Sequence, residues 1–186
     1  MAKRRGCMKL IFGTGKMLLL LAVLLSVSVL IPNSVVMAQD DVIRHPNCPY
    51  CGMDRAKFAH SRFYIEYDDT TAVGFCSLHC AAMDLALKID KAPNVLMVGD
   101  HNSKKLIDAE KAYWVIGGDK MGVMTVRAKW AFKNKANADS FIKAHGGKPA
   151  TFDDAVRATF EDMHDDVQMI RKKRKMMRLK MKKSGS

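Results

Sequence analysis

The chain has 186 residues and a formal net charge of +12 at pH 7, but its basic residues concentrate at the two ends. Five precede residue 17 and nine lie between Arg171 and Lys183, which leaves 17 basic residues against all 19 acidic ones in residues 39–170. A body this close to neutral excludes a polyanion-binding domain, and its length suits one ordinary domain or two small lobes.

Residues 1–38 are predicted to be a cleaved signal peptide. Five basic residues precede an apolar run from Met17 to Leu30, and Val36-Met37-Ala38 fits the small-x-small pattern of a processing site. The run falls short of the roughly 20 residues that a membrane span needs. We therefore expect a periplasmic protein cleaved after Ala38, with an uncleaved membrane anchor as the alternative.

An irregular segment, residues 39–60, is predicted next, and a first lobe follows over residues 61–100. In this lobe, residues 62–67 and 71–75 have the pattern of strands joined by a turn at Asp68-Asp69-Thr70. Ser77 is a candidate N-cap for a helix over residues 78–87. Residues 94–98 form another predicted strand.

The second lobe, residues 101–170, repeats this plan. Residues 112–116 and 124–132 are strand-like, and a helix over residues 135–144 stops at His145-Gly146-Gly147. Phe75 and Phe132 take matching places at the ends of their strands. A final helix is predicted from Thr151 to about Ile170, so the expected fold class is α+β, with two ββα(β) lobes in tandem and a C-terminal helix.

Residues 171–186 form a basic tail without any acidic residue. We interpret it as a solvated, fraying helix end or a disordered arm. Attraction to an anionic membrane surface is the functional alternative. Nucleic acid is not an expected partner, because an exported protein seldom meets any.

Four cysteines remain after the signal segment, as a C-x2-C pair, a 24-residue gap and a C-x3-C pair: Cys48, Cys51, Cys76 and Cys80. All four could form a closed tetrahedral zinc site. They could instead form two disulfides in an oxidising compartment. A third interpretation is a soft-metal site in which Met53 joins Cys51, because thiolate and thioether ligands select Cu(I).

Three further side chains are candidate ligands. Met121 and Met124 flank Gly122-Val123 at a predicted turn of the second lobe, which is a poor place for core residues. His79 lies between the second pair of cysteines and could bind a metal, although a surface histidine on the first helical turn is equally consistent with the sequence.

The order of these motifs resembles the nitrous oxide reductase accessory protein (NosL) family. The resemblance rests on Cys48-Pro49-Tyr50-Cys51-Gly52-Met53 after an export signal, and on Met121-Gly122 followed by Ala131-Phe132. It implies a pair of ββαβ lobes, Cu(I) binding and delivery of copper to nitrous oxide reductase. The segment Phe75-Cys76-Ser77-Leu78-His79-Cys80 is also similar to the Phe-Cys-Ser-x-x-Cys of small treble-clef heavy-metal (TRASH-like) domains.

We therefore expect a copper carrier rather than an enzyme, since no nucleophile–base pair, phosphate loop or paired-carboxylate motif can be placed in the sequence. Cys51 and Met53 would hold Cu(I) on a mobile segment, with Met121 or Met124 completing the site. Cys48 could assist, and Cys76 with Cys80 could form a second thiolate pair or a disulfide. The alternative is an exported scaffold protein stapled by zinc or disulfides.

Overall fold

The computed structural model describes residues 37–184, so the predicted signal segment up to residue 36 lies outside the described residues. Its first element is helix α2, Met37–Arg44, which includes the predicted processing point after Ala38. Within residues 37–184, no helix is long and apolar enough to span a membrane.

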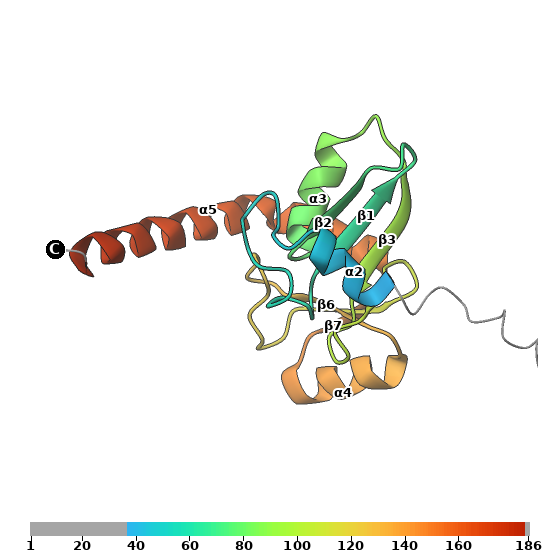
Figure 1. Cartoon of the computed structure of the whole chain (residues 1–186). Helices are drawn as coiled ribbons and strands as arrows, with labels where there is room; N and C mark the ends of the chain where they lie inside the picture. Colours follow the sequence, from blue (N-terminus) through green and yellow to red (C-terminus); the bar gives the residue numbers. More distant parts are fainter. Residues whose placement is uncertain (1–36, 185–186) are drawn as a thin grey trace, which may run out of the picture. The chain divides into compact units, whose positions relative to one another are not determined.

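The first sheet has four antiparallel strands in the order β2-β1-β3-β4 (Figure 1). Strands β1, Phe63–Tyr67, and β2, Ala72–Phe75, form a hairpin in which Phe63 pairs with Phe75. Helix α3, Leu78–Leu87, then leads to β3, Pro93–Gly99, on the other side of β1. Strand β4, Leu106–Asp108, is added at the edge beside β3.

The second sheet has three antiparallel strands in the order β6-β5-β7. Strand β5, Tyr113–Ile116, is central, and β6, Lys129–Phe132, pairs with it so that Tyr113 lies opposite Phe132. Helix α4, Lys135–His145, connects β6 to β7, Lys148–Ala150. In both sheets the first strand is central and is flanked by the second strand and by the strand after the helix. The predicted α+β fold of two ββα(β) lobes is therefore confirmed.

Two parts of the predicted secondary structure are wrong. The strand expected over residues 124–132 occupies only Lys129–Phe132, because Met124 has a φ of 63°, which interrupts an extended strand. Helix α5 runs from Phe152 to Ser184 rather than ending near Ile170. The basic tail up to Ser184 is therefore helical, because Lys, Arg and Met are strong helix formers despite the like charges.

A single hydrophobic core joins the two lobes to helix α5. The Phe152 ring at the start of α5 stacks on Phe63 of β1 at 6.3 Å between centroids, and it lies 5.9 Å from Trp114 of β5. Asp100 adds a polar link, because its carboxylate accepts hydrogen bonds from the amides of Ser103 and Lys133. The two sheets therefore hold their surrounding loops at fixed positions.

Candidate metal centre

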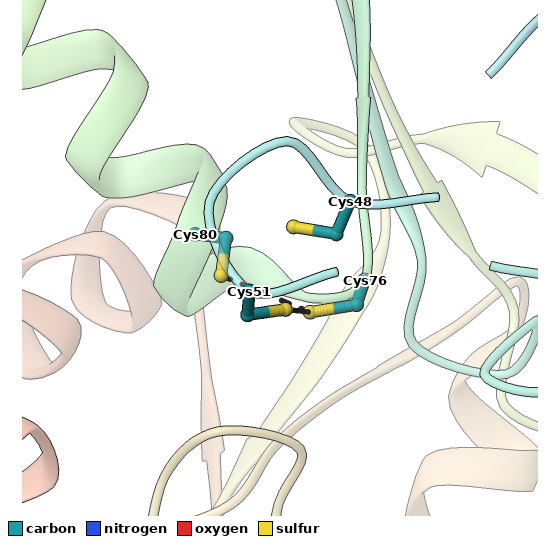
Figure 2. Close-up of side chains that lie close together, drawn as sticks. All are labelled: Cys48, Cys51, Cys76 and Cys80. Carbon is teal, nitrogen blue, oxygen red and sulfur yellow. Dashed lines mark hydrogen bonds between the residues drawn. The ribbon is translucent and has the colours of Figure 1, made fainter. Parts of the chain in front are cut away.

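The first pair of cysteines lies in a tight turn between α2 and β1. The Cys48 amide donates to the Met53 carbonyl at 2.9 Å, and the Gly52 amide donates back to the Cys48 carbonyl at 2.8 Å. Gly52 has a φ of 75°, in the left-handed region that favours glycine. This turn brings the side chains of Cys48 and Cys51 to the same side of the loop (Figure 2).

Arg55 anchors the loop to the body of the protein. Its side chain is fully buried and donates five hydrogen bonds, to the carbonyls of Asp41, His45, Phe63 and Phe75 and to the Asp41 carboxylate. Burial lowers the pKa of Arg55, although the Asp41 carboxylate opposes this change. A guanidinium bonded in this way connects the loop to α2, β1 and β2, so the loop is not the mobile segment that we expected.

Tyr50 connects the same loop to helix α3. Its hydroxyl donates to Asp84 Oδ1 at 2.6 Å, and the Tyr67 hydroxyl donates to Asp84 Oδ2 at 2.5 Å. The Tyr50 ring also stacks on Phe75 at 6.0 Å between centroids. Burial, followed by the bond to the Asp84 carboxylate, raises the pKa of both tyrosines, so both remain neutral donors.

The second pair of cysteines lies where β2 passes into α3. Cys76 follows Phe75 directly, and Cys80 lies in the first turn of the helix that Ser77 precedes as N-cap residue. The N-cap prediction is confirmed in position, although the Ser77 side chain makes no capping hydrogen bond. Cys76 lies before the extended N-cap residue and Cys80 inside the first helical turn, and this junction brings their sulfurs to 3.8 Å from each other.

The four thiols converge on one point (Figure 2). All four sulfur atoms lie within 4.8 Å of one another, with Cys51 Sγ 3.3 Å from Cys76 Sγ and Cys76 Sγ 3.8 Å from Cys80 Sγ. A tetrahedral ion with metal–sulfur bonds of about 2.3 Å requires sulfurs about 3.8 Å apart. All four cysteines are free thiols, and this group could hold a metal ion.

Three of the four cysteines are buried, and the fourth is partly accessible. Cys48, Cys76 and Cys80 are each at most 2% exposed, whereas Cys51 is half-buried. Hydrogen bonds from Cys51 and the other two thiols lower the pKa of Cys48. The same bonds to Cys48, together with burial, raise the pKa of Cys76 and Cys80. The bond with Cys48 raises the pKa of Cys51, but the bonds with Cys76 and Cys80 outweigh it and lower that pKa. Thiolate is thus favoured at the two loop cysteines, and a cation would have to displace protons from the deeper Cys76 and Cys80.

Two of the three candidate methionines pack against the hydrophobic core, and the third is exposed. Met53 is half-buried against the core, and Met124 packs against the same core from the loop before β6. Met121 is 70% exposed, and its sulfur lies 3.5 Å from Lys173 Nζ of helix α5. Their role as ligands stays a prediction.

His79 does not belong to the thiol group. It is buried, and its Nδ1 lies 3.4 Å from Asp166 Oδ2 of helix α5. The other Asp166 oxygen accepts the Val126 amide at 3.0 Å. Asp166 therefore links α5 both to His79, on the helix that carries Cys80, and to the loop that carries Met121 and Met124.

Helix α5 also reaches the accessible edge of the cluster. Arg174 donates to the Cys51 carbonyl at 2.9 Å, and the neighbouring Lys173 lies at Met121. This contact could not be predicted from the sequence, because residues 123 apart in the chain share no local pattern. The supporting residues Arg55 and Asp84 were not predicted for the same reason. An alignment of the family could have pointed to Arg55, which follows the cysteine motif closely in the sequence.

Comparisons with known proteins bear on this arrangement. A family model described as NosL matches residues 41–160. None of the curated proteins matches the chain. Among solved structures, the chain is similar to the copper chaperone NosL from Shewanella denitrificans, with 26% sequence identity and a TM-score of 0.46. That alignment covers 57% of this chain and 87% of the other.

Proposed function

Since the chain belongs to the NosL family, we propose that it is a periplasmic accessory protein, not an enzyme, that binds Cu(I) and delivers it to a copper enzyme such as nitrous oxide reductase. The observation that carries this proposal is the convergence of four thiols from two segments within 4.8 Å of one another. Thiolates are soft ligands, which favour Cu(I) over hard ions. The N-terminal signal pattern supports export.

Delivery requires a ligand that an acceptor can reach. Cys51 is the half-buried member of the cluster, and it lies in the loop rather than at the strand–helix junction. Transfer would begin when a thiol of the acceptor replaces Cys51 on the copper ion, while the buried thiols still hold it. Met53, two residues away, would supply a thioether that stabilises Cu(I) as Cys51 is released.

A second candidate function is a structural zinc site, and one observation favours it. Three of the four cysteines are buried, and the 3.8 Å between the sulfurs of Cys76 and Cys80 suits a closed tetrahedral site. In that case the metal would stabilise the junction of loop, β2 and α3, and no ligand would be exchanged.

Competition against a Cu(I) chelator under anaerobic conditions tests the proposed function. We expect Cys51→Ser to weaken Cu(I) binding at least tenfold while the metal-free protein keeps its melting temperature, because Cys51 is partly accessible. Cys76→Ser should lower both the Cu(I) affinity and the melting temperature of the metal-free protein, since Cys76 is fully buried. Met53→Leu should weaken Cu(I) but not Zn(II), because a thioether is a soft ligand. Tight zinc retention with ready loss of Cu(I) would instead establish the structural site.

A further inference from the structure

Two of the four thiols lie almost in contact, and they come from different segments of the chain. Cys51 Sγ of the loop is 3.3 Å from Cys76 Sγ, which follows β2 directly, and both are free thiols (Figure 2). A disulfide joins sulfur atoms that are about 2 Å apart. A movement of little more than about 1 Å would therefore link the first cysteine pair to the second.

Contacts of Phe75 hold these two thiols together independently of any metal ion. The Tyr50 ring, next to Cys51 in the loop, stacks on Phe75 at 6.0 Å between centroids. Arg55 Nε donates to the Phe75 carbonyl at 3.1 Å. Since Phe75 directly precedes Cys76, the cysteine loop is fixed against the strand end that carries Cys76. The two thiols are thus kept close in the metal-free protein.

A disulfide between these two thiols would close the metal site. A disulfide sulfur is not a thiolate, which is the form of cysteine that binds a metal. The bond would remove one ligand from each cysteine pair, including Cys51, the partly accessible thiol at which copper exchange would begin. Disulfides form and persist in oxidising compartments, so an exported chain needs a source of electrons before it can load Cu(I).

Resting on the proposed function, we propose that the thiol cluster is a thiol–disulfide switch, closed by a Cys51–Cys76 disulfide and opened for copper loading by a protein dithiol reductase. In the closing step the two thiols give two electrons and two protons to a disulfide oxidant, which leaves as two thiols. Closing removes the exchangeable ligand, and opening restores it.

The opening step begins at Cys51, whose sulfur a partner can reach. A thiolate of the reductase attacks Cys51 Sγ, the bond to Cys76 breaks, and Cys76 leaves as a thiolate that takes up a proton. The second thiol of the reductase then attacks the reductase sulfur in the mixed disulfide and passes its proton to Cys51. The chain is left with two thiols, and the reductase is left with a disulfide.

The position of Cys76 favours a dithiol over a monothiol such as glutathione. After either reductant has attacked Cys51, the Cys76 thiol still lies beside the mixed disulfide, because Phe75 ties the loop to the strand end. A neighbouring thiol acts at a high effective concentration, so Cys76 would expel a monothiol and form the internal disulfide again. A dithiol escapes this reversal because its own second thiol completes the reduction.

The test follows the reduction of the full-length oxidised chain. Oxidised glutathione first closes the disulfide. The chain then receives equal thiol concentrations of thioredoxin, of thioredoxin with its second active-site cysteine replaced by serine, or of glutathione. Free thiols are counted, and Cu(I) binding is measured by chelator competition. Two variants accompany the unaltered chain: Cys51→Ser lacks the reachable sulfur, and the matched Cys48→Ser keeps the Cys51–Cys76 pair.

We expect closing to weaken Cu(I) binding at least tenfold, and thioredoxin to restore it at least tenfold faster than either monothiol. Cys48→Ser should lose and regain two thiols as the unaltered chain does. Cys51→Ser should lose its thiols at least tenfold more slowly, since its remaining cysteines are buried. Equal rates with the dithiol and the monothiols, or equal thiol loss from Cys51→Ser and the unaltered chain, would overturn the switch.

The fully reduced chain separates this switch from the proposed function. If the reduced chain does not bind Cu(I), the proposed function fails, and the switch that rests on it fails as well. If the reduced chain binds Cu(I) and the closed chain binds it equally well, only the switch is rejected.

Discussion

The Tyr50 hydroxyl donates a 2.6 Å hydrogen bond to Asp84 Oδ1, which ties the loop with the first two thiols to the helix with the fourth. The Tyr67 hydroxyl of β1 donates to the other oxygen of the same carboxylate. The positions of Cys51 and Cys80 are therefore set by one buried carboxylate as well as by any ion between them.

Replacing the two tyrosines separates the loop contact from general stability. Tyr50→Phe and Tyr67→Phe each remove one hydrogen bond to Asp84, so each should lower the free energy of unfolding by about 1–2 kcal/mol. Only Tyr50→Phe frees the loop, so only this variant should also weaken Cu(I) binding several-fold. Chelator competition and denaturant titration measure the two effects. Equal loss of Cu(I) affinity in both variants would show that Tyr50 has no special role in positioning the loop.

Arg55 should be among the most sensitive positions for stability. Arg55→Met leaves the buried Asp41 carboxylate with fewer partners and frees four carbonyl contacts, so the free energy of unfolding should fall by about 3–5 kcal/mol. Arg127→Met is the matched control, since Arg127 forms partly exposed ion pairs with Glu161 and Asp162 and should cost at most about 1 kcal/mol. Urea unfolding of both variants checks this, and comparable losses would contradict it.

Asp100 should make stability depend on pH. Burial alone would raise its pKa, but hydrogen bonds from the Ser103 hydroxyl and amide and from the Lys133 amide outweigh it and lower the pKa. A carboxyl with a lowered pKa in the folded state stabilises the protein above about pH 4, and this contribution disappears as the pH falls through the folded-state value. The unfolding free energy of Asp100→Asn should therefore lie about 2 kcal/mol below that of the unaltered chain at pH 7 and approach it in acid.

Thermal or urea unfolding between pH 2 and 7 measures this convergence. Asp139→Asn is the control, because Asp139 is exposed and forms an ion pair with Lys135 four residues before it. A constant difference between Asp100→Asn and the unaltered chain across this range would contradict the assignment.

Oxidation of the metal-free protein should link Cys51 to Cys76. Their sulfurs are 3.3 Å apart, and Cys51 is the thiol that an oxidant can reach. Oxidised glutathione would accept the two electrons, and the two thiol protons would pass to the glutathione released. Peptide mapping should find this disulfide, and the product should not bind Cu(I) until it is reduced. A Cys48–Cys51 or Cys76–Cys80 link would contradict the geometry.

The repeated lobes and helix α3 could be predicted because their signals are local. The strand pattern ending at Phe75 and at Phe132 recurs in both halves, and Ser77 precedes an apolar helix at Leu78. Strands β4 and β7 have three residues each, which is too short for any periodicity to show. They form because neighbouring strands offer free hydrogen-bonding edges, which only the folded protein reveals.

The cysteine spacing was compatible with a zinc site, two disulfides or a soft-metal site. That all four sulfurs lie together is seen only in the folded protein. The pairing of Cys51 with Cys76 depends on the loop being fixed by Arg55 and Tyr50, both through contacts with distant residues. The approach of Arg174 to Cys51 depends on how α5 packs against α3 and β5. Such contacts are non-local, so one sequence without an alignment cannot predict them.

The metal content of the protein purified anaerobically from the native periplasm tests the central claim most directly. We expect a mature chain that begins at Gln39 and carries Cu(I), with copper lost from the Cys51→Ser variant expressed and purified in the same way. A chain that carries zinc which Cu(I) does not displace, with zinc retention unaffected by Cys51→Ser, would contradict a copper carrier and leave a structural metal site in its place.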